Sequence, residues 1–410
     1  MNFIDLVFFF YMFVGLYMLS LLILIYVPSR KEIFEHPEGK AEPVSIVMPC
    51  YNEGKHIGAA IEALLKLDYP KDMIEIIVVD DMSKDNSVEV ARRYEKKYSN
   101  VRVLVNKRNS GGAAEPTNMG IKAAKYKYIA VADSDSTPAK DALIKMIGYL
   151  QEDKKVGGVT CAVLAKEPEK FFQKIQKIEY AIIAWNRKLL DMIDAVYVTP
   201  GPFALYRKDI LLEIGLFDTK NMTQDIEIVW RLRKYGYTAK MCLDTKVESA
   251  TPLSFSKWFK QRIRWNIGGT QTMIKYRKYF FKNGMLGAFI IPFFSANLFL
   301  GVVGLGLFTY LLLKRFIVAY LTTHYSIAGN APLLAIQDLT FSPSILNFFG
   351  IILFLAGMTF TFIGLGVMKQ ERSGKGNIFN IIFYMLIYLA IYPIIMITAL
   401  TKLITGRYSW

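Results

Sequence analysis

The sequence predicts an α/β domain inserted between membrane-spanning helices. Apolar residues are gathered into long blocks, a polar region separates the first block from the others, and that region alternates short apolar runs with helical patterns. The 410 residues are 53% hydrophobic and only 21% charged. This composition excludes a disordered chain, and three cysteines are too few for a small disulfide scaffold.

Four apolar blocks predict four transmembrane helices. Residues 3–27 contain one charge, Asp5, and the other blocks, 286–313, 344–368 and 378–401, contain none. Each block exceeds the roughly 20 residues needed to cross a bilayer. We therefore expect these divisions: transmembrane helix 1 in 1–30, a cytoplasmic domain over 40–250, an interface-helix region over 251–284, and transmembrane helices 2–4 in 285–410.

Two alternatives to this count remain open. Phe316–Leu321, in the loop 314–343, could extend a span or re-enter the membrane. The first block could instead be a signal peptide, although its apolar run is long and neither a basic n-region nor a small-residue cleavage site is evident.

Basic residues beside the spans predict the orientation. Arg30 and Lys31 follow the first block, and residues 257–282 contain eight Lys or Arg and no acidic residue. By the positive-inside rule these flanks and the domain between them are cytoplasmic, and the basic loop 369–376 agrees. We expect a multi-pass protein of the plasma membrane.

Other charges and the cysteines complete this picture. Lys314 and Arg315 would lie outside, against the rule, and an even number of spans would put both termini outside. The cysteines show no zinc-site spacing and fit a reducing cytosol. The formal net charge of +15 suits anionic membrane lipids and an anionic substrate. No nucleic-acid partner is expected.

The polar region alternates strands and helices. This rhythm is typical of a parallel α/β sheet, in which ligands bind beyond the carboxyl ends of the strands. The glycine-rich dinucleotide motif and the P-loop motif are both missing from the sequence. The expected strands are Val44–Met48, Glu75–Val79, Val101–Val105 and Tyr128–Ala132, and the expected helices cover 56–67, 87–98 and 117–125.

Three of these strands end in polar clusters. They are Tyr51-Asn52-Glu53, Asp80-Asp81 and Asp133-Ser134-Asp135. Either Asp80 or Asp81 alone is more commonly a turn residue or a cap. Two carboxylates at i and i+2 after a buried strand suit Mg²⁺ or Mn²⁺, and such a cation suits a diphosphate.

A further acidic motif, residues 223–227, opens a helix that runs to Arg233. Thr223 can cap this helix, and the acidic side chains of Asp225 and Glu227 are favourable in its first turn. That structural role is sufficient for Glu227. Asp225 has a second possible role as a general base beside a metal-bound sugar diphosphate.

The basic, aromatic-rich segment 256–266 predicts a helix at the membrane surface. That location accounts for Lys257 and Lys260, and also for Lys275 beyond the segment. The segment 171–193 has apolar residues at steps of three or four, so it could be a second interface helix or could pack against its own domain.

Three side chains of the first segment have further chemistry. Gln261 has an amide donor, Arg264 a planar cation for phosphate oxygens, and Trp265 a flat face on which a sugar ring can stack.

Taken in order, these motifs resemble family 2 glycosyltransferases. A QxxRW pattern beside a transmembrane helix is similar to the membrane-integrated, processive branch, which includes cellulose, hyaluronan and poly-N-acetylglucosamine synthases. The resemblance covers about residues 44–270. The motifs are Val-Ser-Ile-Val-Met-Pro-Cys-Tyr-Asn-Glu (44–53), Val-Asp-Asp (79–81), Asp-Ser-Asp (133–135), Thr-Gln-Asp (223–225) and Gln-Arg-Ile-Arg-Trp (261–265).

The resemblance implies a GT-A (Rossmann-like) fold and inverting transfer from a nucleotide sugar, usually a UDP-sugar, with Mg²⁺ or Mn²⁺. By matching position, Asp225 would be the catalytic base and Asp135 the metal ligand. The implied donor-binding residues are Tyr51, Glu53, Asp81, Asp133, Asp135, Gln261 and Arg264, and the implied acceptor-binding residues are Gly201, Pro202, Phe203 and Trp265.

Two positions depart from the family pattern. Gly111-Gly112 is followed by Ala113 where family members often carry a lysine, and Gln224 replaces a glutamate. The leading interpretation is a synthase that extends a polysaccharide on the cytosolic side and can pass it outward. One alternative is transfer of a single sugar to a polyprenyl-phosphate or another lipid. The other is a catalytically silent binding or scaffold subunit.

Overall fold

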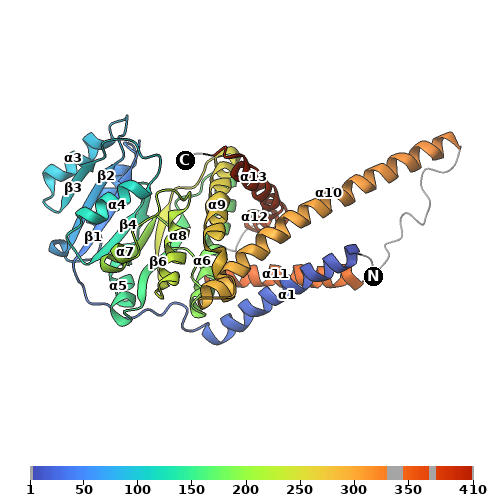
Figure 1. Ribbon diagram of the computed structural model, residues 1–410, viewed down its shortest axis with the longest axis horizontal. Coiled ribbons are helices and arrows are strands. Elements are labelled where there is room, and N and C mark those ends of the chain that lie inside the picture. The colour runs from blue at the N-terminus through green and yellow to red at the C-terminus, as the bar shows by residue number, and fades with distance from the viewer. Residues whose placement is uncertain (1–2, 330–344, 369–374, 409–410) are drawn as a thin grey trace.

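The computed structural model describes residues 3–329, 345–368 and 375–408. A β-sheet flanked by helices forms one end of the molecule, and long apolar helices project from the other end (Figure 1). This arrangement confirms the predicted α/β domain between apolar helices.

The sheet has eight strands in the order β3-β2-β1-β4-β7-β6-β8-β5. The first four strands in the chain pair in parallel, as the strand–helix rhythm predicts. The sheet is mixed beyond them, because β7 runs antiparallel to both β4 and β6. The strands are β1 (Val44–Cys50), β2 (Ile74–Asp80), β3 (Val101–Val105), β4 (Tyr128–Ala132), β5 (Ser136–Pro138), β6 (Val156–Ala165), β7 (Phe203–Arg207) and β8 (Thr238–Ser249).

Helices cover both faces of this sheet. Ile46 and Met48 of β1 pack with residues of α2 and α5, whereas Val47, on the opposite face, packs with residues of α4 and α8. Helix α4 lies very close to β1, since a Cβ added to Gly120 would lie 2.3 Å from Val47. The covering helices are α2 (Ile57–Leu65), α3 (Ser87–Lys97), α4 (Ala114–Ala123), α5 (Ala142–Glu152), α7 (Lys208–Glu213) and α8 (Gln224–Lys234).

Two long helices, α6 (Phe171–Met192) and α9 (Phe255–Tyr276), lie between the sheet and the apolar helices (Figure 1). Most of α6 is buried, including charged side chains such as Glu179 and Arg187. A Cβ on Gly364 of α11 (Ile345–Val367) would lie 2.1 Å from the indole of Trp185, so α11 packs directly on α6. Packing within the protein, rather than contact with a lipid surface, therefore explains the periodic pattern of 171–193.

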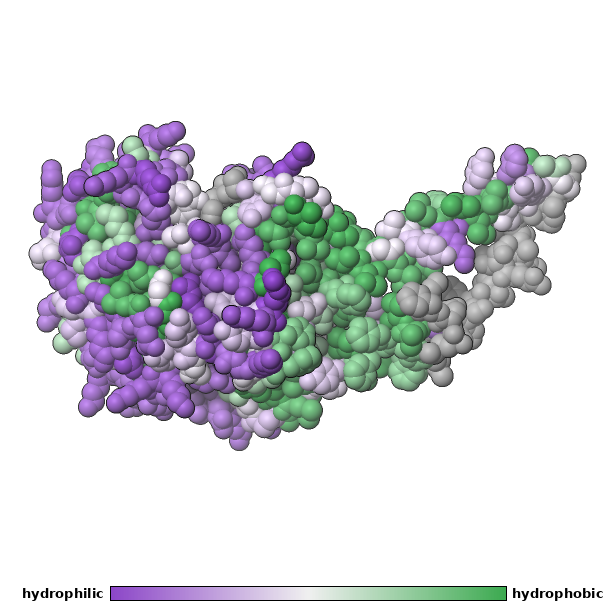
Figure 2. All heavy atoms as spheres, in the orientation of Figure 1, coloured by the Kyte–Doolittle hydropathy of each residue, from purple (hydrophilic) through white to green (hydrophobic). Residues whose placement is uncertain are grey.

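Among the residues that the structure describes, three helices are long and apolar enough to cross a membrane. They are Asp5–Ser29 in α1 (Phe3–Ser29), Leu286–Ala328, which contains α10 (Ile291–Ala328), and Phe348–Val367 in α11. Hydrophobic residues dominate this end of the surface, while hydrophilic residues cover the sheet domain (Figure 2). A fourth span is formed only if the bent pair of segments Ile378–Tyr388 and Tyr392–Thr405 counts as one helix; the bend between them is 42°. The first segment contains most of α12 (Lys375–Phe383), and the second is α13 (Tyr392–Thr405).

Helix α10 continues beyond its predicted span. Its 38 residues correspond to about 57 Å, and they include Phe316–Leu321, so this part of the predicted loop extends the helix. Residues 330–343 of that loop and 369–374 of the basic loop lie outside the described residues.

The two chain ends lie in different places. Helix α1 extends away from the sheet domain, whereas the C-terminus lies near α9 (Figure 1). Tyr408 accepts a hydrogen bond from Gln271 of α9 at 3.2 Å.

Candidate active site

The first cavity lies where β1, β2 and β4 end. Because these strands are parallel neighbours, their carboxyl ends meet at one edge of the sheet. The cavity, of about 540 Å³, brings together the five residues predicted there: Tyr51, Glu53, Asp81, Asp133 and Asp135. We call this set the donor end.

Asp81 fastens the loop that forms one wall of this cavity. Its Oδ1 accepts from the side chain of Asn106, and its Oδ2 accepts from both the backbone and the hydroxyl of Ser110, all at 2.8 Å. The turn role expected for such an aspartate is therefore present. Gly111, Gly112 and Ala113 continue the wall, so small residues line the cavity at the position of the missing lysine.

A second cavity, of about 270 Å³, adjoins the first and shares Asp133 and Asp135 with it. Asp225 also lines this cavity. Its other walls include three residues of α9, which are Gln261, Arg264 and Trp265. We call Asp225 and these three residues the acceptor end.

The segment before β7 also reaches this cavity. Gly201 and Pro202 line it, and a Cβ on Gly201 would lie 3.0 Å from Oδ1 of Asp133. Phe203, predicted with them, has its side chain fully buried in the core of the sheet and is not among the residues that line the cavity. Phe203 begins β7, so strand alternation turns its ring away from the cavity.

A close contact between α9 and the start of α8 places Asp225 near the α9 residues. A Cβ added to Gly268 would lie 2.2 Å from Oγ1 of Thr223 and 2.6 Å from its backbone nitrogen, so only glycine permits this approach. Thr223 occupies the N-cap position, but its hydroxyl donates to Asn221 rather than capping the helix. The backbone N–H of Ile226 donates to Oδ1 of Asp225 at 3.0 Å.

The carboxylates of this site repel one another. The pKa of Asp133 is raised to about 7, chiefly by burial and then by the charges of Asp135 and Asp225, against the opposing effect of Arg264. Burial also raises the pKa of Asp225, while Arg264 lowers it. The pKa of Glu53 is raised by burial and then by Asp135. A group of carboxylates with this excess of negative charge favours binding of a cation.

The acidic side chains shared by the two cavities also fit a divalent ion that is held partly by substrate. Asp133 and Asp135 line both cavities, and Mg²⁺ typically binds one or two carboxylates together with substrate phosphates and water. Within 3–329, 345–368 and 375–408, no group of three or more His, Cys, Asp or Glu side chains could form an all-protein metal cage. The remaining ligands would therefore come from a diphosphate and water.

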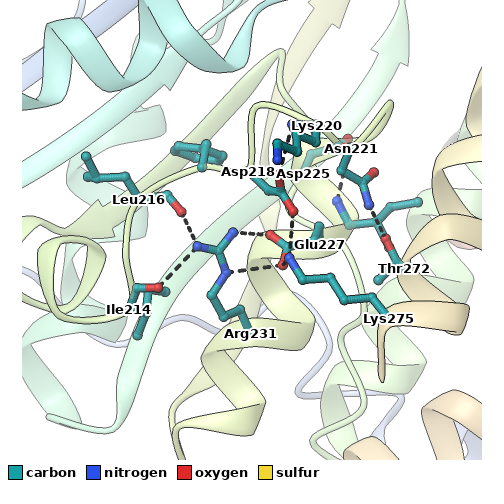
Figure 3. Close-up of polar contacts among 12 residues, drawn as sticks. Ile214, Leu216, Asp218, Lys220, Asn221, Asp225, Glu227, Arg231, Thr272 and Lys275 are labelled. Carbon is teal, nitrogen blue, oxygen red and sulfur yellow. Dashed lines mark hydrogen bonds and ion pairs between the residues drawn. The ribbon is translucent and has the colours of Figure 1, made fainter. Parts of the chain in front are cut away.

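Glu227 is structural, as the sequence suggested. Its fully buried carboxylate accepts from Arg231 in the same helix and from Lys275 and Tyr276 of α9, which ties α8 to α9 (Figure 3). Lys275 also donates to Asp218 at 2.6 Å. Lys275, expected at the membrane surface, is exposed like Lys257 and Lys260, and its ammonium also makes these two ion pairs.

A third cavity, of about 380 Å³, continues from Asp225 and Trp265 toward α10 and α13. Its far walls are largely apolar, with Phe293 and Phe294 among them. Arg187 lines both this cavity and the second one, although the sequence analysis did not single it out. The basic residues of 171–193 gave no signal that one of them faces a cavity.

Comparison with known families identifies the domain. Residues 41–268 match the family model described as glycosyltransferase like family 2, which is more than half of the chain. The chain belongs to this glycosyltransferase family. The match confirms the resemblance drawn from the five motifs, and the protein is a glycosyltransferase with a GT-A-like α/β fold.

Curated relatives are synthases of one polysaccharide. The poly-beta-1,6-N-acetyl-D-glucosamine synthase of Staphylococcus epidermidis is 27% identical over 385 residues, covering 91% of this chain and 87% of the relative. The enzyme of the same name from Staphylococcus aureus (strain COL) is 32% identical over 235 residues, covering 57% of this chain and 56% of the relative.

A solved structure shares the whole architecture. The mannosyltransferase PcManGT from Pyrobaculum calidifontis, in complex with GDP-Man and Mn²⁺, superposes with a TM-score of 0.60. The similarity covers 95% of this chain and 96% of that one at 18% sequence identity. This likeness supports the fold, including its apolar helices.

Proposed function

We propose that this glycosyltransferase extends a polysaccharide by inverting transfer from a UDP-sugar, with UDP-N-acetylglucosamine as the first donor to test. The observation that carries the proposal is the shared wall of the two cavities. Asp133 and Asp135 lie at the junction between the donor end and Asp225, so donor and acceptor can meet there. The product of the Staphylococcus relatives supports the choice of donor.

The donor would contact residues of both ends of the site. Tyr51, Glu53 and Asp81 would hold the nucleotide, and Gln261 and Arg264 would bind the diphosphate. Asp135, with Asp133, would hold Mg²⁺ or Mn²⁺, which would neutralise the diphosphate charge. Gly201, Pro202 and Trp265 would position the acceptor, with the indole beneath a sugar ring.

Asp225 would act as the base. It takes the proton of the acceptor hydroxyl as that oxygen forms a bond to C1 of the donor sugar. The bond from C1 to the phosphate oxygen breaks on the opposite face, and UDP leaves with the electron pair. Arg264 would stabilise the charge that develops on UDP. Since the three aspartates share one cavity, a catalytically silent subunit has little support.

We also propose the location predicted from the sequence, a multi-pass protein of the plasma membrane with a cytoplasmic catalytic domain. The basic flanks of the apolar helices support this orientation. A growing glycan or a lipid-linked acceptor would then meet donors in the cytosol, and membrane lipids would surround the apolar helices.

The test uses the purified full chain in nanodiscs with a panel of UDP-sugars and Mn²⁺ or Mg²⁺. We expect UDP release and a ladder of long polymer from wild type. Asp225→Asn should lower turnover by about 10²–10⁴-fold while the protein stays folded. Asp68→Asn, at an exposed aspartate, is the control. Near-normal turnover of Asp225→Asn would remove Asp225 from this role.

Transfer of one sugar to a lipid phosphate is the second candidate. The third cavity favours it, because apolar side chains from α10 line the cavity beside the cationic Arg187. A single glycolipid product in place of the ladder would select this candidate.

A further inference from the structure

A buried ion pair lies behind the acceptor end. Glu179 of α6 is 2% exposed and Arg262 of α9 is fully buried, and the two side chains pair directly. Charged side chains are almost never buried this completely unless they are paired. Such a pair is favourable only when its geometry is good, because the attraction must offset the desolvation of both charges. Removing one member leaves an uncompensated buried charge.

Arg262 contacts two residues of its motif, Gln261 and Trp265. Its Nη1 donates to Oε1 of Gln261 at 2.6 Å, and its guanidinium lies over the ring of Trp265, 4.0 Å from the ring centroid. The other edge of the guanidinium is fixed, since Nε donates to Glu179 at 3.2 Å and to the hydroxyl of Tyr392 at 3.3 Å. One immobilised cation thus supports an amide and an indole that both line the second cavity.

The last helix pair completes this cluster. Tyr388 donates to Oε2 of Glu179 at 2.7 Å, and the hydroxyl of Tyr392 donates to Oε1. Tyr392 also lines the third cavity, as does Trp265. The C-terminal helices therefore contact the cavity wall and the ion pair behind it at the same time.

We propose that Arg262 is a positioning residue for Trp265 and Gln261, and that Tyr388 and Tyr392 couple the C-terminal helix pair to the acceptor end through Glu179. The proposal rests on the proposed function, because it assigns Trp265 to the acceptor. Arg262 lines neither cavity, so it acts through the side chains that it holds. A lysine cannot replace it, since an ammonium lacks the planar face and the fork of donors.

The test measures the KM for acceptor and donor separately, with a β-1,6-linked N-acetylglucosamine trisaccharide as acceptor and UDP-N-acetylglucosamine as donor. Tyr392→Phe removes one hydroxyl, and Arg262→Lys keeps the charge. We expect each variant to raise the acceptor KM, Arg262→Lys by roughly tenfold, which is the size of a buried cation–π contact. The donor KM should change less, because Gln261 is the donor contact that Arg262 holds and an ammonium can still donate to its amide oxygen.

A matched control is available on α6, the helix that carries Glu179. Lys188 and Asp191 form another buried ion pair of α6, at 2.9 Å, and neither lines the cavities at the site. Lys188→Met should lower the unfolding temperature and leave the acceptor KM at the wild-type value. A purely structural role for Arg262 predicts the same behaviour for both pairs, and that result would overturn the proposal.

A second measurement does not depend on turnover. The emission of Trp265 is obtained as the difference between spectra recorded without and with Trp265→Phe. In the Arg262→Lys background this difference should shift to longer wavelength, because the indole loses its partner. In a double-mutant cycle, Arg262→Lys should add little to Trp265→Phe in the acceptor KM. Additive effects with an unshifted emission would contradict the proposal. Wild-type protein that releases no UDP with any donor would instead count against the proposed function.

Discussion

The donor end and the acceptor end of the site differ in how their charges are balanced. At the donor end, Asp133 and Asp135 repel each other beside a cavity, and the pKa of Asp133 is raised to about 7. Behind the acceptor end, Glu179 and Arg262 are paired within the protein, with two tyrosines completing the contacts. In the proposed mechanism the first region gains its compensating charge from a ligand, whereas the second is paired within the protein.

The two ends also differ in the elements that build them. Loops after three parallel strands form the donor end, and Asp81 holds one of them through three hydrogen bonds. The acceptor end is held by helices in close contact, for example at Gly268 against Thr223. Alignment of the base with the acceptor therefore depends on how these helices pack.

Removal of a charge at the donor end should have the largest effect on turnover. Asp135→Asn should lower turnover by about 10²–10³-fold and raise the Mn²⁺ concentration needed for half-maximal rate, because the cation loses a ligand. Initial rates across a Mn²⁺ titration provide the measurement. Asp135→Glu keeps the charge and should recover part of the rate at high Mn²⁺. An unaltered Mn²⁺ requirement in Asp135→Asn would show that this end does not depend on a cation.

An added methyl group within the acceptor end should have an intermediate effect on turnover. In Gly268→Ala the new Cβ would collide with Thr223, including its backbone nitrogen, so α9 must move away from Asp225. We expect turnover to fall by about tenfold, which corresponds to about 1.4 kcal/mol of activation free energy.

A helical glycine outside the site provides the control for that variant. A Cβ on Gly306 of α10 would meet no atom within 4 Å, and Gly306 lines none of the three cavities, so Gly306→Ala should keep the wild-type rate. Equal rates for the two variants would mean that the close contact of α9 with α8 does not align the base.

The donor end was predictable from sequence because its geometry is local. Each acidic cluster directly follows an apolar strand, and parallel neighbours bring such clusters together. Phe203 shows the limit of matching by motif, since a position inside the matched segment turned out to face the core. Strand β7 begins at that residue, and its antiparallel insertion was not foreseen.

The support of the acceptor end was not predictable, because its partners are distant in the chain. Glu179 lies 83 residues before Arg262 and 209 before Tyr388. In the sequence Glu179 falls among lysines such as Lys177, a pattern that also describes a solvated helix face. Only the packing of α6 between the sheet and the apolar helices makes it a buried partner.

Removal of the positive charge of Arg187 should have the smallest effect on turnover, and the size of that effect should depend on pH. Burial raises the pKa of Asp225, and the positive charge of Arg187, next to that of Arg264, lowers it. Removing that charge in Arg187→Gln destabilises the carboxylate, so the pKa of Asp225 rises further. Since the base must be ionised to accept a proton, the acid limb of the kcat–pH profile should move to higher pH. The rate at pH 6 should therefore fall more than the rate at pH 8, while Arg187→Lys should retain the wild-type profile. A loss that is equal at both pH values would indicate that Arg187 shapes the third cavity without affecting the charge of the base.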